Sequence, residues 1–317
     1  MYKRQIQLNY PLIGAAGYSG LMVWHGGISG SAPIKIAEEG HFLADTIGVI
    51  SQSKTIFSTM NLSISVVLLI TLPLLMYFLG KKNAGSDITI SSDTEEKEFK
   101  ITGAEKLDHS TILAGLFGGG IIFYAFYKGI ILPKKISLNV ITPNYINLLL
   151  LGLAILMHKN FFNFLKAVDS AIVGASGILI QFPLYFGIMG IMNHSGMVEI
   201  MSAFFVSISN ETTFPIFTFI SAGIVNVFVP SGGGQWAVQG PIIIEAATQI
   251  GVSIPKSVMA LAYGDQLTNM LQPFWALPLL GITGLKAKEI LPYTLILLIG
   301  VGLTSLFIGL SSAWIIA

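Results

Sequence analysis

The longest uncharged run of the chain, residues 212–244, constrains its fold more than any other feature. It is 33 residues long, whereas one helix needs only about 20 apolar residues to cross a bilayer. Inside it, the segment 229–241 holds four glycines and two prolines among thirteen residues. Because glycine adds backbone freedom and proline removes an amide donor, we expect the helix to open across this segment at membrane depth. Such a backbone must be buried in protein or line a wet cavity.

A second interruption of similar composition lies roughly 200 residues earlier, where 25–33 reads His-Gly-Gly-Ile-Ser-Gly-Ser-Ala-Pro. Two such breaks, one in each half, are typical of an inverted-repeat transporter whose hairpin tips meet near the midplane. The hydroxyl and amide side chains of Ser231, Gln235 and Gln239, with the amide end of a half-helix, suit an anionic solute. The alternative for both breaks is a packing kink whose backbone is satisfied by neighbouring helices.

Composition places the chain in a membrane. With 53% hydrophobic residues, 10% charged residues and a mean hydropathy of +0.75, it is too apolar for an ordinary soluble domain. The apolar residues form helix-length blocks without period-two alternation. We therefore predict an all-α, polytopic helical membrane protein with inverted repeats and re-entrant or broken helices, and the lipid bilayer as its surroundings. A net charge of +1 gives no reason to propose a nucleic acid as partner.

The chain is expected to have three parts. Residues 1–80 would be the C-terminal part of a first repeat with the first hairpin tip, 81–109 a linker loop, and 110–317 a second repeat with the second tip and a terminal spanning helix. Uncharged or nearly uncharged spans are expected at 55–80, 110–127, 136–157, 170–198 and 290–317.

Lysines predict the orientation of these spans. Five lysines in 81–109, with Lys159 and Lys166, lie on one side, against Lys128, Lys134 and Lys135 on the other. Because cytoplasmic loops carry the excess of basic residues, the linker is expected in the cytoplasm.

A polar stripe follows the second break. Asp265, Thr268, Asn269 and Gln272 are spaced i, i+3, i+4 and i+7, which places them on one face of a helix. An acid inside apolar sequence is costly and in membrane proteins usually serves function, so Asp265 is a candidate for binding a coupling cation or proton. The alternative is a position at the membrane boundary, which Lys256 would mark.

His25 is the one histidine inside a candidate tip, and its side chain has two interpretations. It titrates during transport, or it hydrogen-bonds a nearby carbonyl. Trp24, Trp236 and Trp275 each flank a break, either as the wall of a pocket for a short acyl chain or as interfacial residues. No spacing of histidines fits a metal site, and the absence of cysteine excludes thiolate ligands and disulfides. We expect no metal and no cofactor.

Three motifs closely resemble the short-chain fatty acid transporter family: Val-Pro-Ser-Gly-Gly-Gly-Gln-Trp-Ala-Val-Gln-Gly-Pro at 229–241, Ser-Val-Met-Ala-Leu-Ala-Tyr-Gly-Asp-Gln at 257–266 and Asn-Met-Leu-Gln-Pro-Phe-Trp-Ala-Leu-Pro at 269–278. The resemblance extends through 24–33 and covers nearly the whole chain from about Tyr10 onward. It implies uptake of acetoacetate or butyrate, and a fold of the wider ion-transporter superfamily in which hairpin tips enclose substrate and an elevator-like domain moves.

The chain departs from the pattern that the family leads us to expect. Members carry membrane segments before the position of Tyr10, so we expect this chain to be an N-terminally truncated piece of a longer protein. Asp265 stands where a glutamate is expected, which keeps the charge and shortens its reach. His25 stands where a small residue is more usual, so its protonation chemistry is specific to this chain.

Together these features predict a secondary transporter of short-chain monocarboxylates in the bacterial inner membrane, coupled to H⁺ or Na⁺. The sequence allows a homo-oligomer without specifying one. His25 and Asp265 are the expected coupling residues. The expected substrate-binding residues are Ser29, Gly30, Ser31, Ser231, Gly232, Gly233, Gln235, Trp236, Asn269, Gln272 and Trp275.

Two alternatives remain open at this point. A carrier of dicarboxylates or amino acids on the same scaffold would call for a basic residue near the tips, and Lys35 is the only close one. A membrane-embedded enzyme finds no support, because no Ser/His/Asp set is recognisable and Ser231-Gly232-Gly233-Gly234 lacks the lysine of a phosphate-binding loop.

Overall fold

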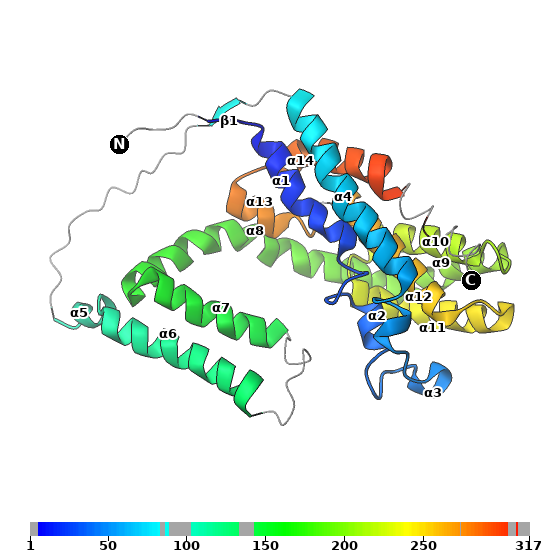
Figure 1. The fold of residues 1–317 in the computed structure, drawn as a ribbon, viewed down its shortest axis with the longest axis horizontal. Helices are drawn as coiled ribbons and strands as arrows, with labels where there is room; N and C mark the ends of the chain where they lie inside the picture. Colours follow the sequence, from blue (N-terminus) through cyan, green and yellow to red (C-terminus); the bar gives the residue numbers. More distant parts are fainter. Residues whose placement is uncertain are drawn as a thin grey trace. The chain divides into compact units, whose positions relative to one another are not determined.

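The computed structural model describes residues 6–82, 86–88, 103–132, 143–272, 274–303 and 309. Its ribbon is almost entirely helical (Figure 1), which confirms the predicted all-α class. The chain divides into two compact units, one made of Met1–Thr89 with Ala175–Ala317 and the other of Ile90–Gly174. The division into repeats at 1–80, 81–109 and 110–317 stays a prediction.

The first unit contains most of the helices. They are α1 (Tyr10–Tyr18), α2 (Ala32–Lys35), α3 (Ala44–Ile47), α4 (Thr59–Lys82), the end of α8 (Phe161–His194), α9 (Met197–Ser207), α10 (Phe214–Phe228), α11 (Gly232–Ile250), α12 (Ile254–Thr268), α13 (Leu277–Thr283) and α14 (Ala287–Leu297). Single 3-10 turns occur at Ser19–Val23, Gln52–Lys54 and Asn269–Leu271, and a π-helical turn, Leu298–Leu303, follows α14. A short strand, β1 (Ile6–Leu8), pairs antiparallel with β2 (Ser86–Ile88), inside the segment that was expected to be a loop.

Two described helices are long and apolar enough to cross a membrane. They are Thr59–Lys82, with 24 residues, and Thr111–Ile131, with 21 residues. Both coincide with spans expected from the sequence, and Pro73 lies inside the first. Part of the expected span 136–157 and part of the span 290–317 lie outside the described residues. A bent helix pair adds a third candidate span if it is counted as one crossing.

That bent pair lies in the second unit, which holds α5 (Glu105–Asp108), α6 (Thr111–Phe126), α7 (Pro143–His158) and the start of α8. α7 and the start of α8 meet at 119° across a two-residue break, where Lys159 has a φ of 67°. α6 and α7 pack closely, since a Cβ on Gly118 would lie 2.9 Å from the Gly152 carbonyl oxygen. Small residues at helix contacts are typical of membrane proteins.

The centre of the first unit is α12. Its residues 257–267 are all buried, so this helix has no solvent or lipid face over that length. Its side chains enter two apolar clusters, one with α1, α4 and α14 and the other with α2, α10 and α11. The closest backbone approach is between α12 and α10, where a Cβ on Gly264 would overlap the Phe219 carbonyl oxygen and lie 2.8 Å from the Ala222 Cβ.

The break in the run 212–244 is shorter than expected. α10 ends at Phe228, only three residues follow, and α11 then continues from Gly232 through Pro241 to Ile250. The expectation of an opening across all of 229–241 is therefore wrong. The glycines at 232–234 occupy the first helical turn, where the amides have no partner within the helix in any case. Pro241 removes a single amide donor from a helix that is otherwise packed on several sides.

Candidate functional site

The two interrupted segments meet in the first unit. Gly232, the first residue of α11, packs against the tip at His25, because a Cβ there would lie 2.8 Å from His25 Cε1 and 2.9 Å from Trp24 Cη2. An ideal Cβ on the next residue, Gly233, would lie 3.9 Å from Ser31 Oγ. Segments that are about 200 residues apart in sequence therefore come into direct contact. Only glycine at position 232 permits this approach.

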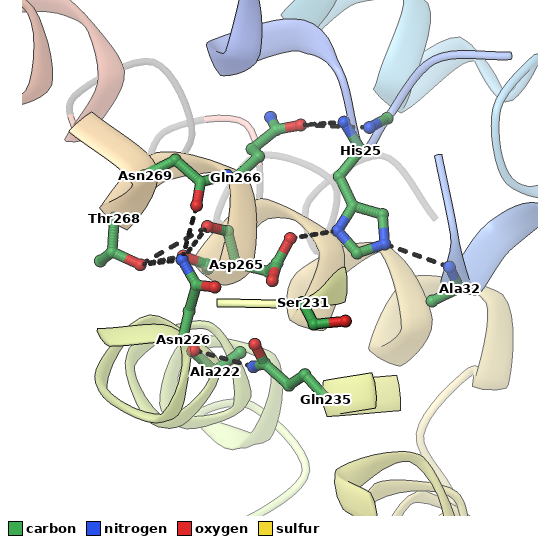
Figure 2. Close-up of polar contacts among 12 residues, drawn as sticks. His25, Ala32, Ala222, Asn226, Ser231, Gln235, Asp265, Gln266, Thr268 and Asn269 are labelled. Atoms are coloured by element: carbon green, nitrogen blue, oxygen red, sulfur yellow. Dashed lines mark hydrogen bonds and ion pairs between the residues drawn. The ribbon is translucent and has the colours of Figure 1, made fainter. Parts of the chain in front are cut away.

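A buried, hydrogen-bonded histidine–aspartate pair occupies the meeting point. His25 Nδ1 lies 2.5 Å from Asp265 Oδ2, and the two side chains are 0% and 1% exposed (Figure 2). The other ring nitrogen, Nε2, accepts a hydrogen bond from the Ala32 amide at 3.1 Å. A nitrogen that accepts an N–H bond carries no proton, so the ring proton is on Nδ1 and is donated to Asp265. The histidine is thus neutral, and the pair is charged only through the carboxylate of Asp265.

The structure adds contacts for both residues. Asp265 is buried within the first unit, and His25 hydrogen-bonds a carboxylate and an amide, not a carbonyl oxygen. Their roles in coupling stay predictions. In the part of the chain that the structure describes, no lysine or arginine lies within ion-pair distance of Asp265. The pair therefore carries one net negative charge in a buried site.

Side chains from two other helices hold the first tip in place. Gln266 Oε1 accepts hydrogen bonds from the backbone amides of His25 and Gly26, at 3.0 and 3.1 Å. Asn61 of α4 donates to the Gly26 carbonyl oxygen at 2.8 Å and accepts from the Tyr263 hydroxyl at 2.9 Å. The conformation of this glycine-rich segment is thus fixed from both sides.

The predicted polar stripe faces one residue of α10. Asn226 Nδ2 donates to the Asp265 carbonyl oxygen (2.8 Å), to Thr268 Oγ1 (3.0 Å) and to Asn269 Oδ1 (3.0 Å). Gln272 Nε2 donates to the Asn226 carbonyl oxygen at 3.2 Å, so every member of the stripe contacts this asparagine. Asn269 and Gln272 were expected to bind substrate. In the structure their side chains form hydrogen bonds that join the end of α12 to α10.

On α11, the amide side chains are used in the same way. Gln235 Nε2 donates to the Ala222 carbonyl oxygen at 2.8 Å and to Gln239 Oε1 at 2.9 Å. Gln239 Nε2 donates in turn to Ser221 Oγ at 2.8 Å. This chain of bonds fixes α11 against α10 and aims the oxygen of Gln235 toward the Asp265 side of the site (Figure 2).

The start of α11 presents backbone amides. Ser231 caps the helix, because its Oγ accepts from the Gly234 amide at 3.2 Å. The amides of Gly232 and Gly233 donate to no acceptor among the described residues. They lie at the positive end of the helix, where an anion is favoured. This is a suitable anchor for a carboxylate group.

Aromatic rings surround only one side of the site. Trp24 packs on His25 with ring centroids 4.7 Å apart and lies 6.4 Å from the ring of Trp275, which in turn contacts Phe274. Trp236 is elsewhere, since its ring is fully buried in the cluster shared by α2, α10 and α11. The structure therefore groups two of the three flanking tryptophans and separates the third.

The remaining residues of the first tip differ in position. Ser29 is exposed, and Ser31 is half-buried and precedes α2 without a side-chain cap bond. Gly30 is buried against the backbone, where a Cβ would overlap the His25 carbonyl oxygen. Sequence reasoning missed Asn61, Asn226, Tyr263 and Gln266. For Asn61 and Asn226, an amide inside an otherwise apolar run was the available signal. Among the described residues, no three histidine, aspartate or glutamate side chains come close enough together to hold a metal ion.

These observations define a helical, polytopic membrane protein in which two interrupted segments enclose a buried site with one negative charge. The family model described as "Short chain fatty acid transporter" matches residues 1–311, and the chain belongs to that family. The family is one of transporters, and the resemblance found in the motifs is confirmed.

Two curated relatives support the assignment. The chain is 39% identical to a candidate short-chain fatty acid transporter of Escherichia coli (strain K12), over 90% of the chain and 65% of that protein. It is 37% identical to one of Haemophilus influenzae (strain ATCC 51907 / DSM 11121 / KW20 / Rd), over 92% of the chain and 67% of that protein. The chain thus spans about two thirds of the length of these relatives. No solved structure matches it.

Proposed function

We propose that the protein is a secondary transporter that takes up short-chain monocarboxylates, such as butyrate and acetoacetate, across the bacterial inner membrane together with a cation. The observation that carries this proposal is the close packing of Gly232, the first residue of α11, on His25 of the buried His25–Asp265 pair. Membership of the family and the names of the two relatives support the same substrate class.

A carboxylate fits the start of α11. The amides of Gly232 and Gly233 and the hydroxyl of Ser231 lie within one turn, so they can hold a single carboxylate without a basic side chain. The short apolar tail would then lie toward Trp24 and Trp275. Each methylene of the tail is worth about 1–3 kcal/mol, so pocket size decides between butyrate and its neighbours.

The charge of Asp265 makes a co-transported cation part of the proposal. A substrate carboxylate bound at Gly232 would lie close to the ionised pair. Two like charges about 4 Å apart repel by about 4 kcal/mol at the effective dielectric of a protein surface, and by more inside. A cation that binds beside Asp265 removes this repulsion. The anion also gains a driving force against the negative interior of the cell.

The position of Lys35 disfavours the alternative of a dicarboxylate or amino acid carrier. This is the basic residue closest in sequence to the first tip, but its ammonium group pairs with Glu38 at 2.8 Å and is more than half exposed. A second carboxylate in the site would have no cationic partner there.

The test is uptake of labelled butyrate and acetoacetate into proteoliposomes that contain the full-length protein, with imposed proton or sodium gradients. We expect gradient-driven accumulation that propionate and valerate compete and that succinate and alanine do not. Accumulation of succinate or alanine instead would refute the monocarboxylate class and support a carrier of dicarboxylates or amino acids. Covalent change of the substrate would revive the enzyme alternative.

A further inference from the structure

Three buried oxygen atoms beside the His25–Asp265 pair have no hydrogen-bond donor in the described part of the chain. They are Asp265 Oδ1, Asn226 Oδ1 and Gln235 Oε1. They belong to α12, α10 and α11, and none of the three residues is more than 1% exposed. Figure 2 shows the three side chains pointing toward one another, with Ser231 beside them. Because buried polar atoms are nearly always partnered, three such oxygens together require an explanation.

The identity of these atoms as oxygens is fixed by their neighbours. Asn226 Nδ2 faces the carbonyl oxygen of Asp265, and Gln235 Nε2 faces the carbonyl oxygen of Ala222. A carbonyl oxygen only accepts hydrogen bonds, so the nitrogen of each amide must point to it and the amide oxygen must point away. The three atoms are therefore acceptors, and a group that binds them all must be positively charged or a donor.

The charge of the site selects among such groups. His25 is neutral, so Asp265 gives the three oxygens a total charge of −1. One monovalent cation makes the site neutral. A divalent cation would leave an excess positive charge next to the positive end of α11. A proton on Asp265 Oδ1 would make one O–H donor, which can reach one of the other two oxygens and leaves the third without a partner.

We propose that Asp265 Oδ1, Asn226 Oδ1 and Gln235 Oε1 form a binding site for a sodium ion. Carboxylate and amide oxygens are hard ligands, and hard alkali and alkaline-earth cations prefer them. Sodium is the smaller of the two abundant alkali cations, which suits a site buried between three packed helices. The inference deepens the proposed function and rests on it for the role of the ion in transport.

The position of the site explains how ion and substrate depend on each other. Gly232 packs against His25, so the open amides of α11 and the three oxygens lie on adjoining sides of the His25–Asp265 pair. Sodium bound at Asp265 removes the repulsion of a substrate carboxylate, and the carboxylate in turn favours the cation. Each therefore raises the affinity for the other by the same factor.

The ion is tested without transport. The thermal unfolding midpoint, Tm, of the purified full-length protein in detergent is measured in NaCl, KCl and choline chloride at equal ionic strength, without substrate. A ligand that binds only the folded state raises Tm, and the rise continues with the logarithm of the ligand concentration once this exceeds the dissociation constant. We expect this rise with NaCl and not with KCl or choline chloride. Equal Tm values in all three salts would overturn the site, and an equal rise with KCl would overturn the assignment to sodium.

Asp265→Asn assigns the effect to the proposed ligands. The change keeps the shape of the side chain and removes the charge, so the sodium concentration that gives a fixed rise in Tm should increase at least about tenfold. Asp45→Asn is the matched control, because the same chemical change is made at an exposed position. An unchanged sodium response in Asp265→Asn would contradict the proposal. Should this variant not fold, Gln235→Met gives the same readout, since methionine keeps the length and lacks the amide oxygen.

The outcomes separate this inference from the proposed function. Butyrate uptake without a sodium-dependent Tm would leave the transporter in place and refute the sodium site. A sodium-dependent Tm that Asp265→Asn abolishes, with no uptake of any monocarboxylate, would keep the site and refute the substrate class.

Discussion

At the scale of single residues, the site depends on one missing side chain. Gly232→Ala places a methyl group 2.8 Å from His25 Cε1 and 2.9 Å from Trp24 Cη2. Overpacking of this kind costs about 1–3 kcal/mol, and relief requires the start of α11 to move away from the His25–Asp265 pair. We expect butyrate affinity to fall by about 5- to 150-fold, the equivalent of that strain, in a competition-uptake assay.

Gly20→Ala is the control for this glycine. No atom lies within 4 Å of the position that its Cβ would take, so the methyl group meets open space. Alanine in this short helical turn should leave affinity unchanged and raise stability slightly, by about 0.5–1 kcal/mol at most. Equal affinities for the Gly232→Ala variant and wild type would show that contact at His25 is not needed for binding.

The hydroxyl of Tyr263 supports the first tip indirectly. It is the donor for Asn61 Oδ1, and both side chains are buried. In Tyr263→Phe this oxygen loses its partner, which costs about 1–3 kcal/mol of unfolding free energy. Tyr10→Phe removes a hydroxyl that donates to the Thr283 carbonyl oxygen in a part-buried position, where water can replace it, and should cost less. Thermal unfolding in detergent compares the two, and a larger loss in Tyr10→Phe would contradict the buried network.

At the scale of elements, α10 and α12 form the frame of the site. The two backbones are closest at Gly264, where a Cβ would overlap the Phe219 carbonyl oxygen and lie 2.9 Å from the Gly223 amide nitrogen. Backbone atoms cannot move aside as a flexible side chain does. Gly264→Ala should therefore separate the helices and destabilise the protein by at least about 1–3 kcal/mol. The Tm of this variant is compared with the Tm of Gly120→Ala in α6, whose Cβ would meet nothing within 4 Å. An equal decrease of Tm in the two variants would refute this packing.

The elements also show where sequence patterns stop being informative. Apolar runs located α4 and α6, because length and hydropathy depend on composition alone. The extent of the break at 229–241 was misjudged, because glycine and proline have different effects at the start of a helix and in its interior. The bend of 119° between α7 and α8 was not predicted, since residues 158–161 contain neither glycine nor proline.

At the scale of the whole molecule, the sequence predicted which segments carry the candidate site. It was less informative about which side chains point into that site. Acid and glycine patterns found Asp265, His25 and Gly232, which the structure brings together. Asn226 was missed, because an amide inside an apolar run does not indicate its partners, which it acquires only when α10 packs on α12. Trp236 looked equivalent to its neighbours in sequence, but its direction on α11 places it in another cluster. Which side chains of two packed helices face each other is a tertiary property that local sequence does not encode.

The orientation in the membrane gives the last prediction. Because the chain has no cysteine, single cysteines report the side of the membrane without background. Lys106 and Lys128 are exposed and lie before and near the end of the candidate span Thr111–Ile131. The excess of lysines around 81–109 predicts that Lys106 faces the cytoplasm. A membrane-impermeant maleimide should therefore label Lys106→Cys in inside-out vesicles only and Lys128→Cys in right-side-out vesicles only.

Each other labelling pattern has a definite meaning. Labelling of both cysteines from one side would show that Thr111–Ile131 does not cross the membrane. The reverse pattern would keep the span and invert the protein, which would place the basic linker outside, against the rule that short basic loops stay in the cytoplasm. A carrier coupled to an inward sodium gradient must open its site to each side of the membrane in turn. The same two cysteines then provide reference points that assign each opening to one side.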